Sequence, residues 1–164
     1  YHSQCKVQER SEETHQVFSD FWGSPYGKLW INSYRIWTEN PVLGVGMKNF
    51  RVACDTMLSK GETDYCNLHS HNVYLEFLSE LGAIGLLGLI ALIGSMVWFI
   101  LAQRTANNLN SYIVTMFAMA NIVINFFPFA AAQSIFANWP GILAWQSLAW
   151  ALAIARSEGK HHYA

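Results

Sequence analysis

The sequence predicts an all-α fold: a fragment of a multi-span helical membrane protein in which a partly helical loop region precedes three transmembrane helices. Seven of the ten Lys and Arg residues and ten of the eleven Asp and Glu residues lie within residues 1–81. From residue 82 to residue 155 the single charged side chain is that of Arg104. This division predicts a water-facing first part and a membrane-embedded second part. The net charge of −1 gives no reason to expect a nucleic-acid partner.

Three uncharged segments are the predicted membrane spans. The first, residues 82–102, has 21 residues, which reach about 31 Å as an α-helix and so cross the hydrocarbon core of a bilayer. The second covers residues 111–129, and the third, which is shorter, covers residues 139–155. Residues 103–110 and 130–138 are the predicted connectors between them.

Basic residues determine the predicted orientation. Arg104 follows the first span, and Arg156 and Lys160 follow the third. Three crossings bring these positions to one side, which the positive-inside rule makes cytoplasmic. Residues 1–81 are then expected to face the periplasm or the cell exterior, and residues 156–164 to form a cytoplasmic tail.

The start of the chain and its cysteines bear on the wider protein and its compartment. The chain opens with Tyr1 and no signal-peptide pattern follows, so we expect the C-terminal piece of a larger membrane protein rather than a complete small one. Residues 1–20 are polar and are expected to be a mobile or surface segment.

Cys54 and Cys66 would form a disulfide on an oxidising side, leaving Cys5 unpaired. Three reduced or buried thiols are the alternative.

Details of the spans favour a helical bundle. Asn121 and Asn125 are four residues apart, so they share one helix face and need partners within the bundle. Pro128 is expected to end or kink the second span. Three glycines recur at every third position of the first span and would permit the close approach of another helix: Gly82, Gly85 and Gly88.

The water-facing part is predicted to contain a helix. A turn is expected at residues 23–27, and residues 28–40 then have helical periodicity, which Pro41 ends. Gly44 and Gly46 predict a tight turn, with a phosphate-binding loop as the alternative. The aromatic residues of the helix form a stripe that would suit the membrane interface: Trp30, Tyr34 and Trp37.

The run His69-Ser70-His71-Asn72, directly before the first span, holds the main candidate site residues. As metal ligands, the two histidines would share a face of a strand but lie about 200° apart on a helix. Glu76 does not complete a ligand face, so we expect no metal. As structural residues, the histidines would hydrogen-bond the loop while Asn72 caps the following helix.

Catalysis is the third interpretation of this run. The unperturbed pKa of histidine, about 6.5, lets the side chain take or guide a proton near neutral pH. The helix N-terminus beside it offers unpaired N–H groups and the positive end of the helix dipole to an anionic leaving group. An arginine such as Arg35 could bind phosphate oxygens through its planar guanidinium group.

These motifs resemble the C-terminal part of the O-antigen ligase and O-antigen polymerase superfamily, bacterial inner-membrane glycosyltransferases of the GT-C type. One motif is a histidine and a small polar residue followed by a spaced Gly-x-x-Gly, here His71-Asn72 and then Gly82 and Gly85. The resemblance covers residues 24–100 and weakens over the last two spans. An upstream segment resembles part of the same large periplasmic loop: Arg35-Ile36-Trp37, then Pro41, Gly44, Gly46 and Phe50.

The resemblance implies a reaction and its residues. Members transfer a glycan from undecaprenyl pyrophosphate to a hydroxyl acceptor, and the family is understood as independent of metals, so no cofactor is expected. By resemblance, His71 is the essential catalytic histidine and Arg35 the loop arginine that engages the pyrophosphate. Arg51 as a phosphate contact, His69 as a supporting residue and Asn72 beside them complete the expected substrate-binding set.

The expected function is that of an O-antigen ligase, which attaches O-antigen to lipid A–core in the bacterial inner membrane, with the active loop facing the periplasm. In the expected inverting displacement, His71 is the general base and Arg35 stabilises the departing pyrophosphate, while Glu39 only pairs with Arg35 along the helix. The fragment alone is expected to be inactive, because the spans that hold the lipid lie upstream.

Two other functions remain open from the sequence. An O-antigen polymerase, which joins lipid-linked repeat units, shares the same motifs. A non-enzymatic membrane transport or assembly subunit would instead use the histidine loop as a pH-sensitive gate.

Overall fold

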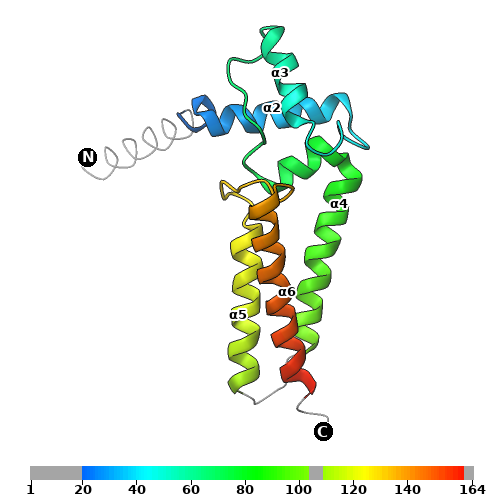
Figure 1. The fold of residues 1–164 in the computed structure, drawn as a ribbon, viewed down its shortest axis with the longest axis vertical. Helices are drawn as coiled ribbons and strands as arrows, with labels where there is room; N and C mark the ends of the chain where they lie inside the picture. The colour runs from blue at the N-terminus through cyan, green and yellow to red at the C-terminus, as the bar shows by residue number, and fades with distance from the viewer. Residues whose placement is uncertain (1–19, 104–108, 161–164) are drawn as a thin grey trace, which may run out of the picture.

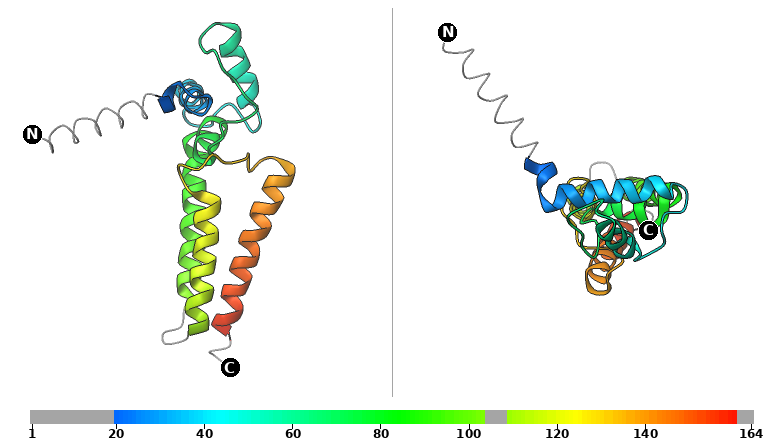
Figure 2. Two further views of the ribbon diagram at one scale, coloured as in Figure 1. Left: turned by 90° about the vertical axis from the view of Figure 1, so that its left-hand side faces the viewer. Right: turned by 90° about the horizontal axis from the view of Figure 1, so that it is seen from above.

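The computed structural model describes residues 20–103 and 109–160, and all regular secondary structure within these ranges is helical. The predicted all-α class is confirmed there. The helices are α2, Pro25–Glu39; α3, Phe50–Ser59; α4, Val73–Ala102; α5, Leu109–Phe126; and α6, Asn138–Lys160. Helices α4, α5 and α6 run along the long axis of the molecule, α2 lies across one end of them, and α3 lies beyond α2 (Figure 1, Figure 2).

Two of the described helices, α4 and α5, are long and apolar enough to cross a membrane. Buried residues make up 17% of the most apolar window of α4 and 28% of that of α5, so most of their apolar side chains face outward. This exposed apolar surface is consistent with a membrane protein. Helix α6 includes the third predicted span and extends five residues beyond it. It is not among the described helices that are long and apolar enough to cross a membrane. The third crossing therefore stays a prediction.

Helix α2 begins three residues earlier than predicted, because the expected turn at residues 23–27 contains its first helical residues. Ser24 is the N-cap, and its hydroxyl accepts a hydrogen bond from the Gly27 N–H at 3.2 Å. Pro25 occupies the first helical position, where no N–H is needed. The helix ends before Pro41, as predicted.

The predicted aromatic stripe is not the buried face of α2. Tyr34 is 55% exposed, and Trp30 and Trp37 are only partly buried. The buried face packs against α3 and α4 and consists of smaller side chains: Gly27, Leu29, Asn32, Ser33 and Ile36. A hydrophobic cluster of α2 and α3 residues lies here, apart from the core of the bundle.

Helix α3 has no counterpart among the predicted elements, because ten residues offer few turns in which a periodic pattern can show. Its buried residues do have helical spacing: Phe50, Cys54 and Met57. The Cys54 sulfur is bonded to that of Cys66 in the loop before α4, so the first of the two alternatives for this pair applies. Cys5 lies outside the described residues.

Helix α4 has a break at Gly82, at the predicted boundary between the water-facing and membrane parts. Gly82 has φ 69° and ψ −164°, so the peptide groups on both sides lose helical partners. The loop of residues 41–46 replaces these partners with four backbone hydrogen bonds of 2.8–3.4 Å. The pairs are Val45 N–H with Ser79 O, Gly46 N–H with Glu80 O, Ala83 N–H with Pro41 O, and Ile84 N–H with Val42 O.

This contact requires glycine on both sides. A Cβ on Gly82 would lie 2.3 Å from the Val42 carbonyl oxygen, and one on Gly44 would lie 2.5 Å from a carbonyl oxygen of α4. The prediction that the glycines of the first span allow another helix to approach is wrong for the described residues. Gly82 faces a loop, Gly85 faces a side chain of its own helix, and Gly88 has nothing within 4 Å.

The glycine loop is a tight turn, the first of its two interpretations, and it continues into a carboxylate-binding segment. The carboxylate of Glu80, which is 1% exposed, accepts hydrogen bonds from the Lys48 N–H at 2.7 Å and the Phe50 N–H at 3.3 Å. The anion held at the start of α3 therefore belongs to the chain itself.

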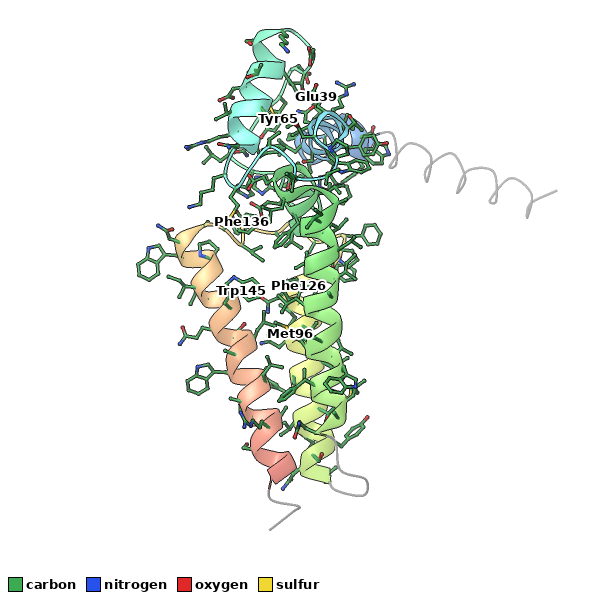
Figure 3. All side chains as sticks on the ribbon, turned by 90° about the vertical axis from the view of Figure 1, so that its right-hand side faces the viewer. Glu39, Tyr65, Met96, Phe126, Phe136 and Trp145 are labelled. Atoms are coloured by element: carbon green, nitrogen blue, oxygen red, sulfur yellow. A yellow bond between two sulfur atoms is a disulfide. The ribbon has the colours of Figure 1, made fainter. Side chains whose placement is uncertain are left out.

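The core of the bundle is formed by aliphatic and aromatic side chains from all three long helices. Met96 of α4, Phe126 of α5 and Trp145 of α6 lie between the helices (Figure 3). The ring centroids of Phe126 and Trp145 are 6.3 Å apart. These contacts make α4, α5 and α6 one packed unit.

The predicted partners of the asparagine pair are present. Asn125 Nδ2 donates to Asn121 Oδ1 at 3.1 Å, and the Ser147 hydroxyl of α6 contacts the Asn121 and Asn125 side chains at 3.4 and 3.5 Å. Helix α5 ends at Phe126, two residues before Pro128, so the prediction that this proline ends the helix is confirmed.

We expect Gly82→Ala to destabilise the full-length protein by about 3 kcal/mol or more, because alanine is strained at this φ and its Cβ would displace the loop. Gly88→Ala, a change in the same helix at a position without neighbours, is the matched control and should change stability by at most about 1 kcal/mol. The measurement is the Tm of the detergent-solubilised protein. Equal Tm values for the two variants would contradict the role of the break.

We expect Cys54 and Cys66 of the full-length protein, in a Cys5→Ser background, to resist maleimide labelling until a reductant is added. Loss of the bond should cost about 3 kcal/mol of stability, because the unfolded chain regains the freedom of the 12-residue loop. The double variant Cys54→Ala/Cys66→Ala measures this cost through its Tm. Free labelling without a reductant would show that the pair is not bonded.

Candidate functional site

The histidine run forms a turn that ends in the N-cap of α4. Asn72 Oδ1 accepts hydrogen bonds from the Tyr74 and Leu75 N–H groups, both at 3.1 Å, so the predicted N-cap is confirmed. The Ser70 hydroxyl donates to the Asn72 carbonyl at 2.9 Å and is fully buried. The turn is thus fixed on the helix that follows it.

The segment between α5 and α6, residues 127–137 (the connector), holds the turn from the other side. Asn72 Nδ2 donates to the Pro128 carbonyl at 2.6 Å, and the Ala132 N–H donates to the His71 carbonyl at 2.9 Å. The Tyr74 hydroxyl donates to the Phe126 carbonyl at 2.7 Å. The backbone of His71 is therefore hydrogen-bonded to the connector, about 60 residues further along the chain.

Glu76 anchors the same connector. Its side chain is 2% exposed, and a carboxyl oxygen accepts a hydrogen bond from the Ile135 N–H at 3.4 Å. The sequence alone does not predict that Glu76 holds the connector, because Glu76 is weighed there only as a possible metal ligand. Phe136 of the connector packs on Phe77 of α4, with ring centroids 5.0 Å apart.

His71 stands at the centre of the site in an unusual backbone conformation. Its φ is 56°, in the left-handed region, which costs a residue other than glycine about 1–2 kcal/mol. Its ring packs on two others: the centroid of His69 is 4.1 Å away, and Tyr26 of α2 meets it edge-on at 5.5 Å. Asn67 Nδ2 lies 3.1 Å from His71 Nε2. Tyr26 is 47% exposed, and His71 itself is partly exposed.

The environment of His69 favours its neutral form. Burial lowers the pKa of the His69 imidazole, the nearby His71 lowers it further, and a hydrogen bond to the Ala132 backbone opposes both. Within the described part of the chain, His69 Nε2 is buried and has no hydrogen-bond partner. The ring that packs against His71 is therefore one whose surroundings disfavour a positive charge.

The two arginines lie away from this turn. Arg35 is exposed on α2, about 14 Å further along the helix axis than Tyr26 and half a turn around it, and its Nη1 donates to the Glu62 carbonyl at 2.9 Å. Arg51 is exposed on α3. Among the described residues, neither arginine forms a hydrogen bond with a histidine, and the predicted ion pair of Arg35 with Glu39 is absent.

The structure thus brings His69, His71 and Asn72 together and leaves Arg35 and Arg51 apart. Asn72 is 4% exposed and its side chain is engaged on both sides, so it positions the turn rather than facing a substrate. In the described ranges, no third His, Cys or carboxylate joins the histidines to form a group of possible metal ligands. The absence of a metal from the reaction stays a prediction.

A cavity of about 220 Å³ lies between α5 and α6 and is lined in part by the connector. Its lining is largely apolar, with Asn125 and Gln133 as its amide side chains. No predicted site residue lines it. His71 is itself partly exposed, beside Tyr26.

Several residues of the site have no counterpart in the sequence-based prediction. Asn67 lies four residues before His71, but the loop between them has no periodicity that would indicate a contact. Tyr26 and the connector reach the turn only through the tertiary fold. The residues added by the structure are Tyr26, Asn67 and Ala132, together with Glu76, which sequence-based prediction considered only as an unsuitable metal ligand.

A protein-family model matches the first half of the chain. The family model described as O-antigen ligase matches residues 6–90, which are 85 of the 164 residues and include the histidine turn, the break at Gly82 and the loop that fills it. No curated protein and no solved structure matches the chain.

We expect the two halves of the Asn72 contact to separate by substitution. Asn72→Ala removes the N-cap and should cost about 1–2 kcal/mol, with faster amide exchange at Tyr74 and Leu75. Asn72→Asp keeps the accepting oxygen, so these amides should stay protected, while the loss of the bond to Pro128 should speed exchange in the connector. Hydrogen–deuterium exchange of the full-length protein measures both. Identical exchange patterns in the two variants would contradict this division.

Proposed function

The chain belongs to the O-antigen ligase family, and from this we propose that the full protein transfers a glycan from undecaprenyl pyrophosphate to a hydroxyl acceptor during cell-surface polysaccharide synthesis. We propose O-antigen ligase as the activity, with O-antigen as the transferred glycan and lipid A–core as the acceptor. O-antigen polymerase, which joins lipid-linked repeat units by the same kind of glycan transfer, is the alternative.

One observation carries the proposal: the imidazole of His71, a partly exposed residue, is held in a left-handed backbone conformation directly before the N-terminus of an apolar helix. Such a conformation persists only where the surrounding structure imposes it, and here the bond to Ala132 and the N-cap of Asn72 do so. A lipid-linked substrate would present its pyrophosphate near such a helix end, where the dipole is positive.

In the proposed mechanism, His71 is the general base. The acceptor hydroxyl gives its proton to the imidazole while its oxygen attacks the anomeric carbon, and inversion follows from attack opposite the leaving group. The bond between the anomeric carbon and the pyrophosphate oxygen breaks, and its electron pair leaves with undecaprenyl pyrophosphate. We propose that no metal takes part.

The neighbours of His71 have supporting roles in this proposal. A neutral His69 packs on the catalytic ring without adding a charge beside it. Arg35 would bind the pyrophosphate, and for this its guanidinium must exchange the bond to the Glu62 carbonyl for phosphate oxygens. Arg51, also exposed, is proposed as a further phosphate contact.

We propose that residues 1–81 face the periplasm and that the protein is a multi-pass protein of the bacterial inner membrane, in contact with its lipids. The bond between Cys54 and Cys66 supports this side, because disulfides persist in oxidising compartments. In this arrangement α4, α5 and α6 cross the membrane, and the chain after residue 155 is cytoplasmic.

The test is complementation of cells that lack the full-length parent gene. Asparagine tolerates positive φ, so His71→Asn removes the imidazole with little change to the backbone, whereas His71→Ala also adds strain. We expect both variants to lower glycan transfer by about 10²–10⁴-fold, as for loss of a general base. Surface glycan and undecaprenyl-linked glycan are compared in membranes with equal amounts of inserted protein.

The accumulated species separates the activities. Long lipid-linked polymer indicates a ligase, and single lipid-linked repeats indicate a polymerase. Arg35→Ala should also reduce transfer, whereas Tyr34→Ala, an exposed change on the same helix, should not. Full transfer by His71→Asn would overturn the catalytic role, and a mere shift in pH dependence would favour a gating subunit.

A further inference from the structure

The amide of Asn67 is oriented by its own backbone neighbour. Its Oδ1 accepts a hydrogen bond from the Leu68 N–H at 2.7 Å, so the other end of the amide, Nδ2, faces the ring of His71. The distance from Asn67 Nδ2 to His71 Nε2 is 3.1 Å. Exchanging the two amide atoms would place an oxygen against Nε2 and an amide nitrogen against the Leu68 N–H, where two donors would meet. The orientation is therefore determined by hydrogen bonding.

This orientation determines the tautomer of His71. An amide nitrogen donates and does not accept, so Nε2 must be the unprotonated nitrogen that accepts. The neutral ring then carries its proton on Nδ1. In the part of the chain that the structure describes, the other groups around His71 form no hydrogen bond with its ring nitrogens. The rings of His69 and Tyr26 pack against the ring, and the Ala132 N–H donates to the backbone carbonyl of His71. Among the described residues, Asn67 alone hydrogen-bonds a ring nitrogen of His71.

We propose that Asn67 is a positioning residue that sets the tautomer of His71, so that Nε2 presents its lone pair to the acceptor hydroxyl. This inference rests on the proposed function. Nε2 has a single lone pair in the ring plane, so the hydroxyl takes the place of the Asn67 amide when the acceptor binds. The proton then passes from the hydroxyl to Nε2, the ring becomes imidazolium, and the acceptor oxygen bonds the anomeric carbon as pyrophosphate leaves.

Asn67→Asp tests the inference with almost no change in size. A carboxylate accepts and does not donate, so it would draw the proton of His71 onto Nε2 and reverse the tautomer. Asn67→Ala removes the amide without imposing the wrong tautomer. Asn49→Asp is the matched control, because Asn49 also donates through Nδ2, to the Val45 carbonyl at 3.0 Å, away from the histidine turn.

The direct measurement is ¹⁵N NMR of the full-length protein with labelled histidine, with the His71 signals assigned by difference from His71→Asn. We expect the wild type and Asn49→Asp to show neutral His71 with the proton on Nδ1, and Asn67→Asp to show it on Nε2. A wild-type ring protonated on Nε2, or an unchanged tautomer in Asn67→Asp, would overturn the inference.

Transfer activity gives the second readout. We expect Asn67→Asp to lower transfer by about 10²-fold or more, since a wrong histidine tautomer costs serine proteases about 10⁴-fold. Asn67→Ala should retain more activity than Asn67→Asp, the reverse of what a merely structural amide would give. The acidic limb of the pH profile should move up by about one pH unit in Asn67→Asp, because a carboxylate beside the ring favours imidazolium.

The two proposals fail in different ways. Transfer by Asn67→Asp equal to the wild type, with His71→Asn inactive, would overturn the role of Asn67 and leave the catalytic role of His71. Full transfer by His71→Asn would overturn the proposed mechanism itself, while the tautomer measured by NMR would still decide whether Asn67 sets the protonation of the ring.

Discussion

The backbone hydrogen bonds between the loop of residues 41–46 and the break of α4 at Gly82 are the interaction on which the rest of the structure depends. A broken helix leaves carbonyl and N–H groups without partners, and leaving such groups unmet in an apolar region costs several kcal/mol. The loop of residues 41–46 supplies the hydrogen-bond partners that a further turn of the helix would have given these groups. Because Gly44 and Gly82 have no side chains, the two backbones come close enough for this pairing. The loop region is thereby joined to the apolar helix at a defined position.

A second set of contacts holds the histidine turn at that junction. Asn72, the N-cap of α4, and Glu76, one helical turn later, form hydrogen bonds with the connector between α5 and α6. The connector in turn donates a hydrogen bond to the backbone of His71. On the opposite side, the bond between Cys54 and Cys66 and the contact of Tyr26 tie the turn to the loop region. His71 thus lies where two separately packed clusters meet, and this explains how a strained backbone is maintained at that position.

The proposed chemistry depends on the hydrogen bonding of the His71 ring. A general base needs an unprotonated nitrogen that faces its substrate, and Asn67 supplies a donor where a carboxylate would demand a proton. His69 adds an aromatic contact, and the burial of its imidazole disfavours a charge there. Arg35 belongs to a different part of the loop region, where it bonds the Glu62 carbonyl, so its proposed contact with the donor depends on a movement that the histidine turn does not need.

The sequence by itself determined the all-α class, the apolar helices α4 and α5, the end of α5 before Pro128, the N-cap at Asn72 and the family motif, because each depends on residues within a few turns of one another. Only the tertiary structure decided the break at Gly82, the bond between Cys54 and Cys66, the separation of Arg35 from the histidines and the contacts of Asn67 with His71. The physical reason is that these features need backbone conformations with positive φ, or contacts between distant segments. Neither charge distribution nor helical periodicity carries information about them.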